Sequence, residues 1–329
     1  MSARARVMAA LRGDPVDRVP VSVWAHNFTA ENSAQELCEE AVRRALEFDW
    51  DYLKPQSRAH CFAETWGLKY APSARRAVPP TVVSYPLHAA GDLRSLRPAD
   101  PRTGALGEQL EALALIRARI GADRPIIWTV FSPLMTARYL FPGGEAQIMD
   151  IMRAEPAALE GALEAMTETL AEYARACVQQ GADGIFLATT LARRDVLSPA
   201  ECRRFERKYD VAILRAAGQA PFNVMHVCGD NVLFEEFFDY PIAAFSWAAT
   251  PGNPSLSEVP RRTGRAAIGG LPAKPVFKTL TAEQARGHVR RAVSETHGRR
   301  LLLGPECSID PETPASLLRA VFDAVRAGA

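Results

Sequence analysis

The sequence lacks any hydrophobic run of the roughly 20 residues that are needed to cross a membrane. It also lacks an excess of charge, because 39 Lys and Arg against 38 Asp and Glu leave a net charge of +1. Composition therefore gives no reason to expect nucleic acid or a membrane surface as a partner. Residues 1–12 contain no long apolar core or small-residue cleavage site and are typical of a short amphipathic helix. We expect a cytoplasmic protein.

Cysteine is scarce, and its spacing is not that of a disulfide scaffold. The six cysteines are spread over 329 residues, at positions 38, 61, 177, 202, 228 and 307. This distribution favours a reducing compartment, in which free thiols are available to a metal ion. Positions 38, 177 and 202 fall within helical patterns, so we expect ordinary thiols there, whereas Cys228 and Cys307 each end an apolar run.

A glycine-rich dinucleotide fingerprint is absent after the first expected strand, but a steady alternation of strands and helices is present. We predict eight strands, at 19–24, 51–54, 125–131, 184–190, 222–227, 243–247, 266–271 and 301–306. We predict helices at 34–48, 110–120, 144–153, 157–180, 198–217, 231–238, 255–263, 281–295 and 314–327. This alternation predicts an α/β fold, a single (β/α)8 TIM barrel over residues 1–329. The irregular residues 56–103 are predicted to be an insertion after the second strand that covers part of a pocket, with 81–85 as a hairpin strand.

The motif His226-Val-Cys228 ends the fifth predicted strand. Side chains two apart on a strand point to the same side, so an imidazole and a thiolate would project together from its C-terminal end. Cys307 ends the eighth strand, and in such barrels the C-terminal strand ends open onto one mouth. Nitrogen and sulfur are the ligands that zinc prefers. Each of the three residues alone is better explained as an ordinary buried side chain, but the three together favour a Zn²⁺ site.

Other strand ends supply further candidate site residues. His26 and Asn27 follow the first strand, and either a substrate contact or a simple loop role fits them. Lys54 ends the second strand, where it would meet a substrate anion or stay solvated. Trp247 ends the sixth strand and is expected to form a wall of the pocket. Glu306, beside Cys307, is a candidate fourth ligand or proton acceptor, or else a structural carboxylate.

Several segments together resemble the uroporphyrinogen decarboxylase superfamily. They are Ala9–Val21, which looks like the entry into the first strand, and the later stretches His226–Gly229, Gly269–Leu271 and Gly304–Cys307. The resemblance covers most of the chain except the region around 56–103. It implies a TIM barrel and one of two activities. The decarboxylase branch is metal-free and carries an Arg-Gln-Ala-Gly-Arg stretch after the first strand, where this chain has no arginine in residues 24–30.

The other branch contains cobalamin-dependent methyltransferases that act on thiols such as coenzyme M and bind zinc through His-x-Cys and a later Cys. His226, Cys228 and Cys307 match that pattern, so the resemblance implies this branch. It implies a methyl transfer between a corrinoid, methylcobalamin or one carried on a corrinoid protein, and a small thiol or similar acceptor. The alternative is a metal-free decarboxylase of uroporphyrinogen or another carboxylate. A non-enzymatic corrinoid carrier is a third possibility, although the Asp-x-His-x-x-Gly motif of corrinoid-binding domains is absent.

Overall fold

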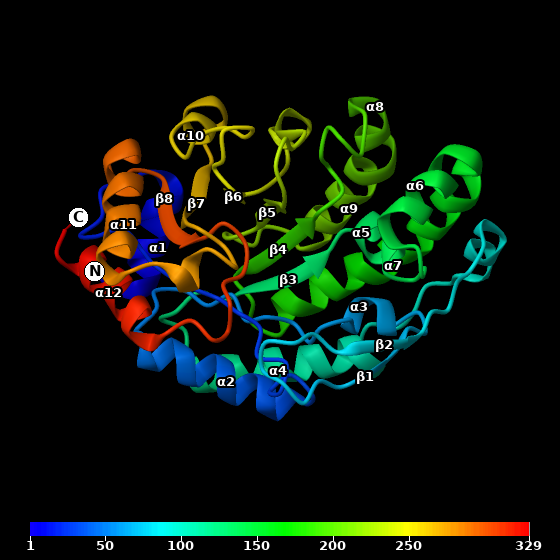
Figure 1. The fold of residues 1–329 in the computed structure, drawn as a ribbon, viewed down its shortest axis with the longest axis horizontal. Coiled ribbons are helices and arrows are strands. Elements are labelled where there is room, and N and C mark those ends of the chain that lie inside the picture. The colour runs from blue at the N-terminus through cyan, green and yellow to red at the C-terminus, as the bar shows by residue number, and fades with distance from the viewer. Residues whose placement is uncertain (329) are drawn as a thin grey trace.

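The computed structural model describes residues 1–328, and its centre is a parallel sheet of six strands that are paired in chain order, β3 to β8. These strands are Ile127–Phe131, Gly184–Thr189, Val224–Val227, Ala244–Ser246, Ala266–Leu271 and Leu301–Pro305. The sheet curves around a central axis, and the long helices lie on its outer side (Figure 1). This arrangement is the α/β barrel that the alternation of strands and helices predicted.

Two short segments close the ring between β8 and β3. Val21 forms a parallel bridge with Leu303 of β8, and Leu53 forms one with Ile126 beside β3. The two segments are joined by the Asp51 backbone N–H, which donates to the Val21 carbonyl at 2.9 Å. The six strands and these two segments therefore give eight extended segments around the barrel, as expected.

The predicted strands 19–24 and 51–54 are single bridges rather than hydrogen-bonded ladders, and here the prediction was wrong in detail. Pro20 and Pro125 directly precede the bridging residues Val21 and Ile126 and have no N–H to donate. The N–H of Val21 is also unavailable to a neighbouring strand, because it donates to the Asp51 carboxylate at 2.9 Å. Proline and a side-chain acceptor therefore shorten the first two strands without opening the ring.

The helices follow the predicted order with a few differences. The long ones are α2 (Ala34–Glu47), α4 (Gly104–Ile120), α6 (Gly144–Ala154), α7 (Pro156–Gln179), α9 (Lys208–Ala216), α11 (Ala282–Thr296) and α12 (Ala315–Arg326). The short ones are α3 (Cys61–Glu64), α5 (Pro133–Arg138), α8 (Pro199–Cys202), α10 (Glu258–Thr263), the π-helix η2 (Arg203–Arg207) and the 3₁₀ turns η1 (Ala90–Ser95), η3 (Phe234–Phe237) and η4 (Phe277–Thr279). The predicted helix 231–238 is only the turn η3, and α3 and α5 were not predicted. Among the described residues, no helix combines the length and the apolar character needed to cross a bilayer.

The core has two parts because successive strand residues point to opposite faces. Phe186, Val224 and Ile268 belong to the cluster inside the barrel, whereas their neighbours along the strands pack in the larger cluster under the helices. Helix α1 (Ala3–Arg12) contributes Val7 to the inner cluster and contacts β7 and β8. The inside of the barrel is thus filled near α1, and space for a ligand remains at the C-terminal ends of the strands.

Residues 56–103 form the predicted insertion. An antiparallel hairpin pairs β1 (Lys69–Ala71) with β2 (Thr81–Ser84), which confirms the expected hairpin strand. The first residues of the insertion, 56–63, line a cavity at the barrel mouth together with Pro79. The insertion therefore covers part of the pocket, as predicted.

Candidate active site

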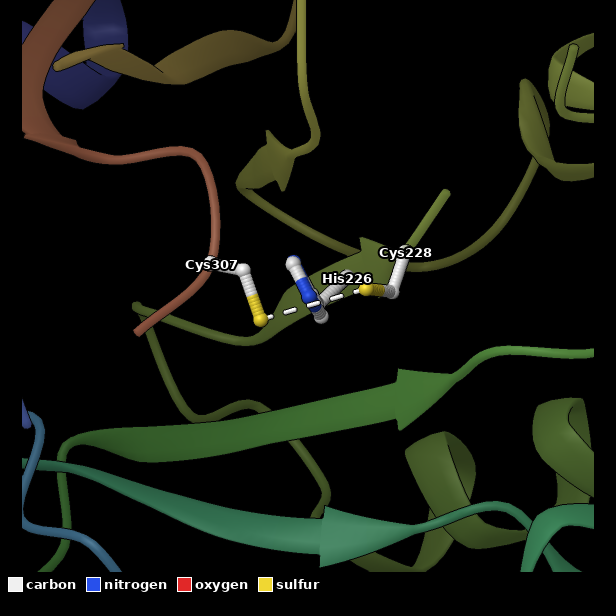
Figure 2. A group of neighbouring side chains, drawn as sticks. All are labelled: His226, Cys228 and Cys307. Carbon is white, nitrogen blue, oxygen red and sulfur yellow. Dashed lines mark hydrogen bonds between the residues drawn. The ribbon is translucent and has the colours of Figure 1, made fainter. Parts of the chain in front are cut away.

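His226, Cys228 and Cys307 come together at the C-terminal ends of β5 and β8. Their ligand atoms all lie within 4.8 Å of one another, and the two Sγ atoms are 3.9 Å apart. Figure 2 shows the side chains of His226 and Cys228, from β5 and the residue after it, and of Cys307, from the loop after β8, pointing toward one another. The predicted convergence of two distant strand ends is therefore present in the structure.

The His226 ring is held in one orientation by its surroundings. Its Nδ1 lies 3.1 Å from both the backbone carbonyl and the hydroxyl of Ser246 on the adjacent strand β6. The ring also stacks on Phe186, with centroids 5.0 Å apart. Because a carbonyl can only accept, Nδ1 carries the proton, and Nε2 is left with a lone pair for a metal.

The geometry of the three residues fits zinc. In a tetrahedral centre with Zn–S bonds of about 2.3 Å, two sulfurs lie about 3.8 Å apart, close to the distance seen here. Cys228 Sγ donates a hydrogen bond to Cys307 Sγ. The hydrogen bond from Cys228 and the neighbouring His226 lower the pKa of Cys307 well below its usual range, while the pKa of Cys228 is raised by that hydrogen bond and by burial. This contact favours the thiolate form at Cys307 over that at Cys228.

A cavity of about 290 Å³ lies against this group of three residues. Six aromatic side chains line it, namely Trp24, Phe28, Phe62, Phe131, Tyr139 and Phe186. Its polar wall includes His26, Lys54, Arg58, His60, Thr129, Thr190 and Lys274. A mostly apolar cavity with a few polar groups is the usual form of a small-molecule site, and this one lies next to the candidate metal ligands.

Lys54 lies inside this cavity. Its Nζ donates to Gln56 Oε1 at 2.6 Å and is 4.8 Å from the centroid of the Phe186 ring. Burial lowers its pKa to about 8, and the nearby Cys307 and Glu31 raise it in the opposite direction. The predicted second-strand cation therefore shares a cavity with the candidate metal ligands.

His26 and Asn27 take different places. His26 lines the large cavity, and its Nδ1 contacts Glu31 at 2.7 Å while its ring stacks on Phe28. Asn27 does not line the large cavity but borders a smaller one next to it. Its side-chain oxygen accepts from Thr29, so the amide serves the loop.

Trp247 and Glu306 also lie outside the large cavity, contrary to what the sequence suggested for Trp247. Since the Ser246 hydroxyl points inward to His226, the next side chain points outward, and Trp247 is fully buried against Phe234 with its Nε1 donating to Pro254. Glu306 precedes Cys307 and does not line the large cavity. Burial raises the pKa of Glu306 to about 7, and the three candidate ligands do not include it.

Comparison with known proteins identifies the family of this chain. The family model for uroporphyrinogen decarboxylase (URO-D) matches residues 2–328. The chain belongs to the uroporphyrinogen decarboxylase family. The resemblance drawn from Ala9–Val21 and the later signatures is confirmed, and the family is one of enzymes.

Individual known proteins match this chain to different extents. Methylcobamide:CoM methyltransferase MtaA of Methanosarcina barkeri is 24% identical over 340 residues, which cover 98% of this chain and 96% of that protein. Uroporphyrinogen decarboxylase of Mycobacterium tuberculosis (strain H37Rv) is 27% identical over 194 residues, 58% of this chain and 49% of that protein. A solved methyltransferase from Methanosarcina mazei has a TM-score of 0.83 and 21% identity over 99% of both chains, which shows the same fold.

Within this family framework, sequence reasoning missed several residues of the site. Ser246 was not a candidate, because its contact with His226 depends on the register between β5 and β6, which pairs these two residues directly. Arg58 and His60 were missed because they lie in the irregular insertion. Of these three residues, only Ser246 lies at the end of a predicted strand, where a polar side chain could have been recognised as a site candidate.

Proposed function

We propose that this protein is a zinc-dependent methyltransferase that moves a methyl group between a corrinoid and a small thiol or similar acceptor. The corrinoid is methylcobalamin or one that a partner corrinoid protein carries. The observation that carries the proposal is the convergence of His226, Cys228 and Cys307 within 4.8 Å beside a large cavity. A relative that matches along nearly the whole chain is a methylcobamide:CoM methyltransferase, which supports this assignment.

The three residues would hold zinc through Nε2 and two thiolates. Bound there, zinc would supply a Lewis acid with an open position, where the pKa of an acceptor thiol falls and the thiolate becomes the nucleophile toward a methyl group. The protein prepares these ligands itself. Ser246 keeps the proton on His226 Nδ1, and the proton that Cys228 donates to Cys307 would be released when metal binds, since ligands must be deprotonated.

The rest of the cavity positions the acceptor. The aromatic side chains of the wall, among them Phe186 beside His226, make the cavity unfavourable for water. Lys54 is placed to meet an anionic group of the acceptor or of the corrinoid, because a buried ammonium beside a cavity favours a negative partner. His26 is a second polar contact on the same wall.

The decarboxylase alternative is less consistent with the cavity. A porphyrinogen carries many carboxylates and requires several free arginines to bind them. Arg58 is the arginine that lines this cavity within residues 1–328, and Glu64 binds it at 3.0 Å. The relative named as a decarboxylase matches only 58% of this chain. A decarboxylase would need no metal, so the zinc content of the purified protein distinguishes the two functions.

The first experiment is elemental analysis of the purified, reduced protein beside a Cys228→Ala/Cys307→Ser double variant. We expect about one zinc per wild-type chain and none in the double variant. A Cys177→Ala/Cys202→Ala variant is the matched control, because those thiols are buried in helices away from the cavity, and it should keep its zinc. Thiols are then screened with methylcobalamin, and the S-methyl product is measured by mass spectrometry.

Two results would contradict the proposal. Wild-type protein that carries no zinc and binds none on reconstitution would make the three residues ordinary buried side chains. Full methyl transfer by a His226→Ala variant would show that the reaction does not need them. Release of CO2 from a porphyrinogen that is unaffected by chelators would instead support the decarboxylase function.

A further inference from the structure

A second, smaller cavity adjoins the active-site cavity on the side of α2. Trp24, Lys54 and Gln56 line both, and the remaining wall of the smaller one is mostly apolar and includes Trp50. Its volume is about 40 Å³. One water requires roughly 10–15 Å³, so the space corresponds to about three waters or to one small polar group.

Arg44 of α2 lines this smaller cavity and lacks a close partner. The residue is 7% exposed, and its Nε has no hydrogen-bond partner within residues 1–328. Its ion-pair contact in the same residues is with Glu40, at 3.9 Å from Nη1, which is too long for a hydrogen bond. The guanidinium also lies 5.6 Å from the Trp50 ring. Buried charges in proteins are normally paired, so this arrangement lacks an anion.

The two carboxylates beside the cavity are engaged by other groups. Glu40 binds Arg43 at 2.9 Å and Arg76 at 3.4 Å. Glu31 contacts the His26 ring with one oxygen, and its other oxygen accepts from the backbone of Ala59. Neither carboxylate is therefore free to pair closely with Arg44, while Lys54 adds a second positive charge to the wall.

We propose that this cavity is a binding site for a carboxylate or an oxyanion of similar size, held by the Arg44 guanidinium. The planar fork of arginine matches the two oxygens of a carboxylate, and the apolar remainder of the wall accepts a short alkyl group. The anion is either free in solution or the acid group of the methyl acceptor that extends from the large cavity past Trp24. The free-anion case is independent of the proposed function, and the acceptor case rests on it.

Tryptophan fluorescence tests the site directly, because Trp24 and Trp50 both line it. We expect formate and acetate to change the emission of the wild type saturably at constant ionic strength, whereas chloride and the neutral formamide do not. An Arg44→Met variant should bind formate at least tenfold more weakly. Arg215→Met on the distant helix α9 changes the net charge equally and should match the wild type. Arg44→Lys, which keeps the charge but not the fork, should fall between them.

The affinity of the protein for thiols distinguishes a free anion from the acid group of the acceptor. If the acid group of the acceptor occupies the site, Arg44→Met weakens the binding of 3-mercaptopropionate about tenfold while that of 2-mercaptoethanol is unchanged; if only a free anion occupies it, Arg44→Met weakens formate binding and leaves the binding of both thiols unchanged. If neither formate nor 3-mercaptopropionate distinguishes wild type from Arg44→Met, the proposal is wrong. Should Arg44→Met fail to fold, equal responses of the wild type to formate and formamide overturn it. Formate binding through Arg44 in a protein without zinc would refute the proposed function and leave this site intact.

Discussion

The pH dependence of stability should report a buried carboxyl pair behind the active site. Glu206 and Asp210 are both fully buried, and Glu206 accepts a hydrogen bond from the Thr189 hydroxyl at 2.6 Å, at the end of β4. Burial raises the pKa of Glu206 from 4.5 to about 7, and burial together with the charge of Glu206 raises that of Asp210. Both carboxyl groups are therefore protonated in the folded protein over a pH range in which the same groups are ionised in the unfolded chain.

The sign and size of the effect follow from linkage. Between pH 4.5 and 7 the native state holds a proton on Glu206 that the unfolded chain does not, so the free energy of unfolding falls as pH rises. At about 1.4 kcal/mol per pH unit, the shift of Glu206 corresponds to roughly 3 kcal/mol lost by pH 8. Above pH 7 the stabilisation is fully lost, and below pH 4.5 it is fully present.

Urea unfolding at pH 5, 6, 7 and 8 tests this, with wild type compared to Glu206→Gln. The amide keeps an oxygen for Thr189 but does not titrate, so the variant should gain about 2.5 kcal/mol relative to the wild type between pH 5 and 8, since part of the loss has already occurred at pH 5. Glu164→Gln, at an exposed glutamate that pairs with Lys208, should show the wild-type dependence. Parallel curves for wild type and Glu206→Gln would refute the reasoning.

Three further predictions concern the site and its frame. Ser246→Ala should weaken zinc affinity by about tenfold, the low end for loss of a ligand's hydrogen-bond partner, because the carbonyl of the same residue still orients the imidazole. Competition with a chelator measures the affinity. An unchanged affinity would show that the hydroxyl does not contribute to zinc binding. Lys54→Met should raise KM for an anionic thiol by about 10- to 100-fold, from the roughly 1.5–3 kcal/mol of a hydrogen bond to a charged group. KM for 2-mercaptoethanol should stay constant, and equal losses for both thiols would exclude an anion contact. Gly184→Ala should destabilise the barrel by about 3 kcal/mol or more, since a Cβ there would lie 2.2 Å from the backbone that leads into β5. Gly91→Ala, in open space, should be neutral in the same thermal unfolding assay.

The candidate metal ligands could be predicted because they depend on a short-range rule. His226 and Cys228 are two apart at a strand end, and alternation brings them to one side whatever the details of the barrel. Cys307 required only that β8 opens onto the same mouth as β5. The contact between His226 and Ser246 could not be predicted in the same way, because it depends on the register between two strands, which a short and weakly alternating β6 does not fix.

Trp247 shows how an error of one residue in the position of a strand end changes the predicted side of the sheet on which a side chain lies. A shift by one position moves a side chain from the barrel interior to the layer under the helices, and Trp247 lies in that layer with its indole packed on Phe234. The prediction of the first two strands was wrong for a different reason. Their apolar patterns were correct, but proline and the Asp51 carboxylate removed the donors that a ladder needs.

The cavity is divided into two parts with different structural origins, and this division bears on how specificity arises. The sulfurs lie at the ends of β5 and β8, two strands of the hydrogen-bonded barrel, whereas another part of the wall comes from the insertion at 56–63. Residues of an irregular insertion can change without disturbing the hydrogen-bonded frame. We therefore expect the group of His226, Cys228 and Cys307 to determine the type of reaction. Insertion residues such as Arg58 and His60 should determine which acceptor is methylated, so exchanging residues 56–63 for those of a relative should change the preferred thiol and leave the zinc content unaltered.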